Sequence, residues 1–476
     1  MSAIFDAGVS APARTLRVRS DAIAEVHGVA LLEPVRLSGR EGVNSLFEYE
    51  LLLKTTTAFV GGTSTAELNP DSLLGREVCC SIALDGKGQF IAGALGEAPG
   101  GLGAGVREIN ALVTHAAPAG QQGRHTLYRL TLRPWLHLAT LTTDCKVFQN
   151  KTAIEVLDEL LADYVFPVDK RLYGLEGAAP GHYPRQDYCV QFNESDFEFF
   201  ERVCQEWGIS YHFEHGQGKH RLVLSDAMAS FRANPSAAYQ AVEFHPPGWK
   251  VDAEYIHRFE PTHALTSGQY STRDYDYTQP RADLTVSRAE ARPTAQAQAE
   301  VYQWHASRGG SHYAQPRAGA DTGAGAGGDA HEQGRHLALL RMQALRTHGR
   351  RAQASGNLRA MVPGCTFRLG KHPQAPANAE YLILETTFLI EDVDQASQSR
   401  TGSPVGIGAA AEAAATPQHW CVQVDFTAHP VDETLRPQLT RAKPHTHGPQ
   451  TALVVGPEGQ NLWTDELGRI KVQFPW

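Results

Sequence analysis

The sequence lacks long apolar runs, a leader-like start and a strong excess of either charge. No stretch of its 476 residues approaches the ~18 consecutive apolar residues that a membrane-spanning helix needs. The N-terminal segment has no charged start followed by an apolar core, so we expect no cleaved secretory signal. The formal net charge of −9 disfavours a dedicated nucleic-acid-binding protein, because such proteins present a basic surface.

Paired cysteine motifs are also missing. The seven cysteines are scattered and form no C-x-x-C pair, which argues against a zinc knuckle or a thioredoxin-like motif. Their odd number disfavours a disulfide framework. We interpret them as mostly buried thiols of a chain that folds in a reducing cytoplasm. They are Cys79, Cys80, Cys145, Cys189, Cys204, Cys365 and Cys421.

The common catalytic motifs do not occur. The glycines of Gly93–Gly105 match no phosphate-binding loop, and no G-x-S-x-G turn is present. The string from His331 to His336 resembles H-E-x-x-H but has one residue too many. On a helix, this spacing turns the second histidine about 140° away from the first, and Gly334 weakens the helix. We therefore interpret the similarity of this string to the metalloprotease motif as coincidental.

Two further polar groups resemble sites only weakly. His445 and His447 are either a metal-binding pair or, as we favour, part of an exposed loop. Asp274 and Asp276 place two carboxylates on one strand face with tyrosines opposite. Carboxylate pairs for glycoside hydrolysis normally come from separate elements, so we favour an exposed strand face. The sequence thus predicts no catalytic, cofactor-binding or metal site and no cofactor.

What the chain does have is an ordinary globular composition, with 42% hydrophobic and 20% charged residues. Its length suffices for two to four domains. In Phe47–Leu53, hydrophobic residues alternate with Glu48 and Glu50, which predicts a strand with one buried side. The turn spacing over 15–145 suggests a barrel or sandwich. The predicted strands are Leu16–Arg19, Phe47–Lys54, Val78–Leu84 and Thr126–Leu132.

Helical signals appear between residues 146 and 238. Thr152 with Glu155, and Ser195 with Glu198, each have the spacing of a capping box. Gly208 stands where a left-handed residue would end the second helix. Two strands are then predicted on either side of a glycine turn, Ile209–Phe213 and Arg221–Ser225.

The segment 239–395 returns to β structure with one helix, marked by Leu337, Leu340, Ala344 and Leu345 and ended by Gly349. Within it, Thr366–Leu369 and Tyr381–Ile390 are predicted strands. Two stretches rich in small residues, Gly309–Gly328 and Ala396–Thr416, are predicted to be loops.

Residues 420–476 are predicted to be β again. Arg469–Phe474 alternates regularly, and a tight turn at Asp465–Gly468 is expected to pair it with Gln460–Thr464. Since so strong a strand would leave an unpaired sheet edge, we expect the natural protein to continue past Trp476.

Several strings in a fixed order resemble the VgrG family of type VI secretion spike proteins, over roughly residues 15–476. They are Leu73–Gly75 with Phe90–Ala94, Tyr128–Leu136, Val147–Asn150, Tyr188–Phe197 and Gly208–Phe213, Pro363–Phe367 with His372 and Pro373, Tyr381–Ile383, and Asp465–Trp476. The chain departs from the family pattern in the two loops of small residues and in its end at Trp476. Family members continue there into a barrel and a trimeric needle.

The resemblance implies a mainly β fold with α/β insertions (α+β). It implies two phage-hub-like β-barrel domains followed by the start of an OB-type barrel. The expected boundaries are 15–145 for the first barrel, 146–238 for the α/β segment with its hairpin, 239–395 for the second barrel, 396–419 for a low-complexity loop, and 420–476 for linker strands and the incomplete OB-type barrel.

The resemblance also implies a structural role without catalysis. The expected protein is a homotrimer that caps the Hcp tube, contacts baseplate components, punctures target membranes and delivers effectors. A PAAR-type tip protein and effectors would bind through the missing C-terminal part. It would assemble in the cytoplasm and leave through the type VI apparatus. Two alternatives stay open: a baseplate hub of a contractile phage or phage-like particle, or the scaffold of an enzyme whose catalytic domain follows residue 476.

Overall fold

The computed structural model describes most of the chain. The described residues are 15–23, 25–26, 29–56, 69–87, 101–123, 125–174, 183–246, 253–304, 312–316, 329–392, 420–460 and 463–476. Most of the predicted loop Gly309–Gly328, the whole predicted loop Ala396–Thr416 and residues 93–100 of the glycine-rich stretch lie outside them.

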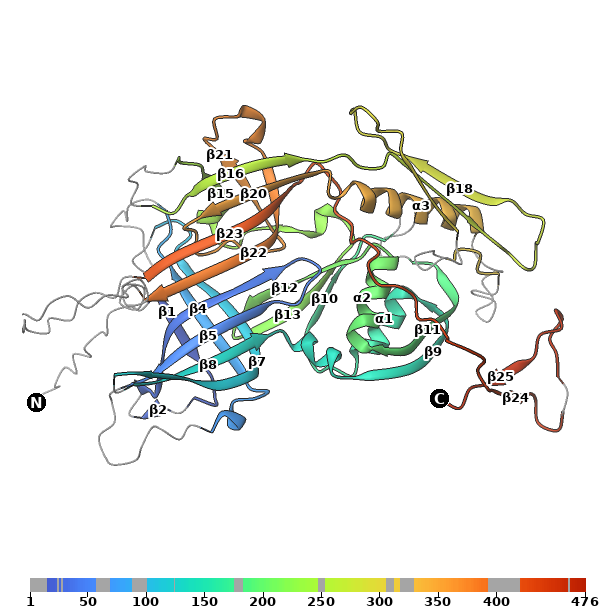
Figure 1. The fold of residues 1–476 in the computed structure, drawn as a ribbon, viewed down its shortest axis with the longest axis horizontal. Helices are drawn as coiled ribbons and strands as arrows, with labels where there is room; N and C mark the ends of the chain where they lie inside the picture. The colour runs from blue at the N-terminus through green and yellow to red at the C-terminus, as the bar shows by residue number, and fades with distance from the viewer. Residues whose placement is uncertain are drawn as a thin grey trace, which may run out of the picture.

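A thirteen-stranded sheet forms the largest part of the structure (Figure 1). One half of it is built from the N-terminal third of the chain, in the order β1 (Leu16–Arg19), β6 (Glu77–Leu84), β7 (Gly105–Gln122), β8 (His125–Arg133), β5 (Glu48–Thr55) and β4 (Leu32–Gly42). The four strands predicted in this region are confirmed to within one residue at each end. Phe47, Tyr49, Leu51 and Leu53 are all fully buried, as their alternation predicts.

The other half of the sheet comes from the C-terminal part of the chain. Its order is β22 (Glu380–Asp392), β23 (Trp420–Pro430), β20 (Arg350–Gly356) and β16 (Ile256–His263), with β21 (Cys365–Gly370) beside β22 and with β14 (Arg232–Ala233) and β15 (Ala241–Glu243) beside β21. The two halves meet where β4 pairs with β22, with Leu37 opposite Ile390. Among the described strands, β1 and β16 end the order without pairing with each other, so the two-barrel division stays a prediction.

The α/β region lies beside this sheet and contains the two helices predicted between residues 146 and 238 (Figure 1). Its elements are β9 (Thr143–Thr152), α1 (Ala153–Leu161), β10 (Val168–Arg171), β11 (Arg185–Ser195), α2 (Asp196–Glu206), β12 (Ser210–Gly216) and β13 (Lys219–Ser225). Both capping boxes are confirmed, with reciprocal side-chain and backbone hydrogen bonds at Thr152–Glu155 and Ser195–Glu198. The β12–β13 hairpin is confirmed too.

A smaller layered unit packs a helix on a sheet. β17 (Gln269–Asp274) lies between β18 (Leu284–Ala289) and β19 (Glu300–Trp304), and α3 (Ala330–Arg346) packs against β17 and β18. Leu337, Leu340 and Ala344 are buried, which confirms the predicted helix face. The described residues contain no helix with the length and hydropathy that a membrane span requires.

The remaining elements are short. β2 (Glu25–Val26) pairs with β3 (Val29–Ala30). Within the described part of the chain, 3-10 helices lie at Pro70–Ser72, Trp135–Thr140, Met228–Ser230, Ala237–Tyr239 and Ala375–Ala377. The cysteines form no disulfide. Three of them are buried and Cys421 is exposed, so the prediction of mostly buried thiols was too broad.

The last strand has a partner that the sequence did not indicate. β25 (Lys471–Gln473) pairs with β24 (Leu453–Val455). Residues 461–462 of the predicted partner Gln460–Thr464 lie outside the described residues, so that pairing stays a prediction. The tight turn itself forms, with the Gly468 N–H donating to the Asp465 carbonyl at 3.0 Å. A second turn is closed by the Gln460 N–H on the Pro457 carbonyl at 3.1 Å. The OB-type barrel stays a prediction.

Candidate functional site

The chain enters a long irregular segment after β23, and this segment is bound to three other elements. We call residues 431–443 the strap. It runs from the large sheet, past the C-terminal end of α3, to α2, before the chain reaches the β24–β25 unit (Figure 1). Because the strap has no strand or helix of its own, side chains from neighbouring elements form many of the hydrogen bonds that its backbone groups need.

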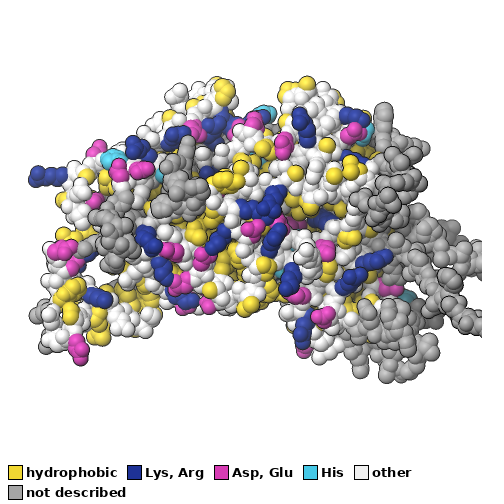
Figure 2. All heavy atoms as spheres, turned by 180° about the vertical axis from the view of Figure 1, so that it is seen from behind, with side chains coloured by type: hydrophobic (Ala, Val, Ile, Leu, Met, Phe, Trp, Pro, Cys, Tyr) yellow, Lys and Arg dark blue, Asp and Glu magenta, His cyan; other side chains and the backbone are white. Residues whose placement is uncertain are grey.

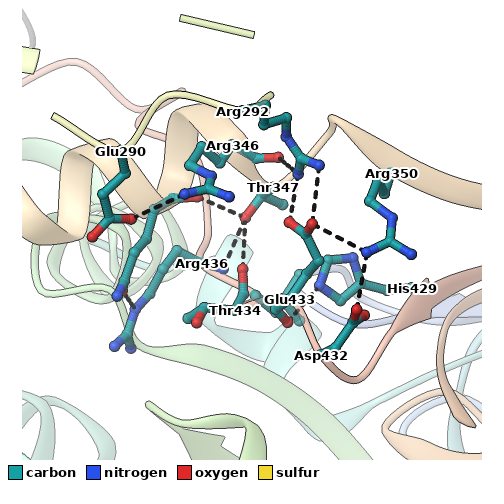
Figure 3. Close-up of polar contacts among 12 residues, drawn as sticks. Glu290, Arg292, Arg346, Thr347, Arg350, His429, Asp432, Glu433, Thr434 and Arg436 are labelled. Atoms are coloured by element: carbon teal, nitrogen blue, oxygen red, sulfur yellow. Dashed lines mark hydrogen bonds and ion pairs between the residues drawn. The ribbon is translucent and has the colours of Figure 1, made fainter. Parts of the chain in front are cut away.

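The first part of the strap is held by arginines. Glu433 accepts a hydrogen bond from Arg292 Nη1 at 2.9 Å, and a second from Nη2, which makes a bidentate pair that is nearly buried. Arg350 Nη1 donates to Asp432 at 3.0 Å. His429 Nε2 donates to the Glu433 carbonyl at 3.0 Å. Figure 3 shows these groups converging below the end of α3.

Arg436 fixes the middle of the strap to three elements at once. Its Nε donates to Gln343 Oε1 on α3 at 2.8 Å, and its Nη1 donates to the Gly208 carbonyl at 3.1 Å and to the Asp226 carbonyl. Burial lowers the pKa of Arg436, with Asp226 acting in the opposite direction. Its backbone N–H donates to Thr347 Oγ1 at 3.1 Å. A largely buried guanidinium with several fixed acceptors favours a single position for the strap.

Gly208 makes this arrangement possible. Its φ of +68° is the left-handed conformation that was predicted after α2. A Cβ on this residue would lie 2.9 Å from Leu340 Cδ2 and 3.3 Å from Arg436 Cδ. The residue is therefore required to be small both by its backbone and by the close approach of the strap and α3.

The last part of the strap lies along α2. Gln205 Oε1 accepts the N–H groups of Thr440 at 2.8 Å and Arg441 at 2.9 Å, and its Nε2 donates to Thr440 Oγ1 at 3.1 Å. Arg441 Nε donates to Glu201 at 2.7 Å. One amide side chain thus holds two successive peptide groups, which sets the register of the strap against the helix.

A lysine closes the contact with α2. Lys443 Nζ lies 2.8 Å from Glu206 Oε1. Burial acts to raise the pKa of Glu206. The positive charges of Lys443, Arg341 and Arg202 together have the larger opposite effect, so the pKa lies below its usual value. The carboxylate is therefore ionised at neutral pH and attracts the basic end of the strap.

A groove of about 590 Å³ opens beside this contact. It lies between the β11–α2 junction and residues 440–450, and Glu194, Glu198, His445 and His447 are among its lining residues. Both histidines lie in an exposed loop, as we favoured. No group of three or more histidine, cysteine, aspartate or glutamate side chains suited to a metal ion occurs among the described residues.

The other residues considered from the sequence lie apart from the strap. His331 is exposed near the start of α3 and His336 is partly buried further along it. The interpretation of Asp274 and Asp276 as an exposed face is wrong, because both carboxylates are buried. Asp274 is buried because it accepts the backbone N–H groups of Tyr313 and Ala314, and Asp276 because it accepts that of Thr278. The sequence did not indicate the residues of the strap, because nothing in a linker-like stretch shows which carboxylates it will contact.

The face of the molecule shown in Figure 2 is mixed in charge rather than basic over its described residues. On the face shown in Figure 2, Lys and Arg side chains are interspersed with Asp and Glu side chains, and no large area carries one sign. This distribution agrees with the net charge of −9 and differs from a nucleic-acid-binding face.

The comparisons with known proteins agree with this architecture. A family model described as "Phage tail baseplate hub (GPD)" matches residues 40–394, most of the chain, and the chain belongs to this family. Two Pseudomonas aeruginosa proteins, the type VI secretion system spike proteins VgrG1b and VgrG1c, are each 30% identical to it, over 97% and 94% of this chain. The resemblance to the VgrG family is thereby confirmed. The chain spans about half the length of these relatives, 53% and 52%.

Two solved structures share the fold. The E. coli c3393 protein, described as a component of the type VI secretion system, superposes with a TM-score of 0.56 at 14% identity, covering 96% of this chain and 89% of that one. The tail protein from Neisseria meningitidis MC58 gives a TM-score of 0.50 at 10% identity, covering 87% of this chain and 96% of that one. The mainly β hub fold is thus confirmed at the level of architecture.

Proposed function

We propose that this chain is the hub part of a type VI secretion spike, and that it works as a structural component without catalysis. In this role it forms a homotrimer, caps the Hcp tube, contacts the baseplate, punctures target membranes and delivers effectors. The observation that carries the proposal is the similarity to named spike proteins over nearly the whole chain. Assembly in the cytoplasm and export through the type VI apparatus belong to the same proposal.

The contacts of the strap support a mechanical role for the chain. A hub that drives a needle has to hold the chain leading to that needle in one orientation. Three contacts fix the strap to the body: the nearly buried pair of Arg292 with Glu433, the guanidinium of Arg436 and the amide of Gln205. Each of these polar groups meets fixed partners in only one position of the strap, so together they favour one orientation, and removal of one partner is costly.

The finer architecture is part of the proposal. We assign the two hub-like barrels to 15–145 and 239–395 and the α/β segment to 146–238, with 396–419 as the connecting loop and the start of an OB-type barrel within 420–476. The β24–β25 unit supports this, because Val454, Ile470 and Val472 leave apolar surface exposed on a two-stranded sheet. An isolated pair of strands is marginally stable, so further strands would complete it. A PAAR-type tip protein and effectors would bind through the C-terminal part of the spike.

One alternative has an observation in its favour. The family description and the Neisseria tail protein both point to phage tails, so a baseplate hub of a contractile phage or phage-like particle has the same fold. Neighbouring genes distinguish the two: capsid and portal genes would indicate a phage, and their absence beside sheath genes a secretion system.

The absence of catalysis in residues 1–476 is tested directly. We expect the purified chain to show no peptidase or glycoside hydrolase turnover on peptidoglycan, with or without added zinc. Turnover that disappears in the His331→Ala/His336→Ala variant would overturn this and favour the enzyme alternative.

A further inference from the structure

The strap enters a small hydrophobic cluster through a leucine. Leu435 is 6% exposed and belongs to a cluster that is separate from the main core. The contacts made by Glu433, Arg436 and Gln205 are polar, so the cluster gives the strap an apolar anchor in addition to its hydrogen bonds. The cluster contains Phe231, Leu382, Leu384 and Leu435, with Val43 and Met228 packed against it.

The sulfur of Met228 also holds the backbone at this anchor. Met228 begins the 3-10 helix Met228–Ser230, and its Sδ accepts the Leu435 N–H at 3.4 Å. A thioether is a weak acceptor that is apolar enough to pack in a hydrophobic cluster. The next N–H along the strap, that of Arg436, donates to Thr347 Oγ1 at 3.1 Å. Met228 therefore contributes both packing and a hydrogen bond directly before the residue that fixes the strap to α3.

Met228 differs in exposure from the other described methionines. It is only partly buried, whereas Met342 and Met361 are both 0% exposed. Small peroxides oxidise the thioether of methionine, and the susceptibility of a methionine follows its exposure. Among the described methionines, Met228 is therefore the one that a peroxide reaches first.

Oxidation would change both contributions of this side chain. A hydroperoxide transfers one oxygen atom to the sulfur: the O–O bond breaks, an S–O bond forms, the sulfur loses two electrons, and the peroxide leaves as water or an alcohol. The sulfoxide oxygen is strongly polar, which makes it costly to bury in a hydrophobic cluster. The added oxygen also needs room beside the sulfur, where the Leu435 N–H lies 3.4 Å away.

We propose that Met228 is a modification site at which a peroxide loosens the strap by forming methionine sulfoxide. The sulfoxide displaces Leu435 from the cluster, while the contacts of Gln205 keep the far end of the strap on α2. Methionine sulfoxide reductases reverse the reaction, so the strap tightens again when the sulfoxide is reduced. The inference rests on the contacts of the strap and not on the spike function, and its test reads the chain by itself.

The test treats the chain with dilute hydrogen peroxide and follows oxidation by peptide mass mapping. We expect sulfoxide to form at Met228 at least about ten-fold faster than at Met342 or Met361. Hydrogen exchange at the amides of Leu435 and Arg436 should then become at least about ten-fold faster, while the amides of the β12–β13 hairpin keep their rates. Methionine sulfoxide reductases should restore the slow exchange.

A matched variant isolates the sulfur. Met228→Leu has a similar volume and cannot form a sulfoxide, so peroxide should leave its exchange at Leu435 and Arg436 as in the untreated variant. It keeps all seven cysteines, so an effect of cysteine oxidation would appear in both proteins. If Met228→Leu does not fold, as judged by near-UV circular dichroism, reversal by the reductases in the parent chain makes the same distinction.

Three results would refute the site. The first is an equal rate of oxidation at Met228, Met342 and Met361. The second is unchanged exchange at Leu435 and Arg436 once Met228 is oxidised. The third is faster exchange that appears equally in Met228→Leu, or that the reductases do not reverse.

Discussion

Three buried or partly buried histidines make the stability of the chain sensitive to acid. Burial lowers the pKa of His220 to about 3 and the pKa values of His336 and His429 to about 4. In the unfolded chain, histidine titrates near pH 6.5. Since the folded-state pKa values are depressed, the stabilisation is complete above about pH 6.5 and is lost as the pH falls toward 4.

We expect the free energy of unfolding in urea to fall by about 2 kcal/mol for each of these histidines between pH 6.5 and pH 5. His429→Gln should reduce this dependence, because glutamine does not titrate. The matched change at the exposed His445 should leave it as in the parent chain. If the free energy of unfolding depends equally on pH in the parent chain, His429→Gln and His445→Gln, this explanation is contradicted.

Arg436 is the single residue on which the position of the strap depends most. Arg436→Met keeps the length and removes the guanidinium, which leaves Gln343 Oε1 and the Gly208 carbonyl without this donor. We expect a loss of about 2–4 kcal/mol in the free energy of unfolding. Arg441→Met, at a more exposed position, should cost less than about 1 kcal/mol. Similar losses in both variants would argue against a special role for Arg436.

At the scale of elements, the register between the strap and α2 is set by Gln205. Gln205→Leu removes the acceptor for two peptide N–H groups and keeps the side chain similar in size. We expect hydrogen exchange to become at least about ten-fold faster at the amides of Thr440 and Arg441, which corresponds to about 1.4 kcal/mol. The amides of the β12–β13 hairpin should be unchanged. Uniform acceleration throughout the chain would indicate general destabilisation instead.

Elements with local signals could be predicted from the sequence, and those that depend on distant partners could not. The capping boxes at Thr152 and Ser195 and the left-handed Gly208 are encoded within a few residues, so their positions were predicted correctly. The exposure of Asp274 and the pairing of β25 with β24 depend on where other segments arrive; the first was predicted wrongly and the second was not predicted. The strap was missed for the same reason, since Glu201, Glu206 and Gln205 lie far from it in the sequence.

At the scale of the whole molecule, the pairing of β4 with β22 joins the N-terminal and C-terminal halves of the large sheet. Seven residue pairs connect these strands, from Glu385 opposite Gly42 to Glu391 opposite Arg36. We expect both halves of the sheet to unfold in one transition. Hydrogen exchange in β5 and β23 should therefore share one dependence on urea. Separate transitions would indicate two independent barrels.

The central claim is that this chain is the hub of a trimeric spike, and the most direct test is the mass in solution. The protein would be expressed at its full natural length and its mass measured by light scattering. A mass of three chains is the predicted result, and binding to the Hcp tube would then be examined. A stable monomer would contradict the account.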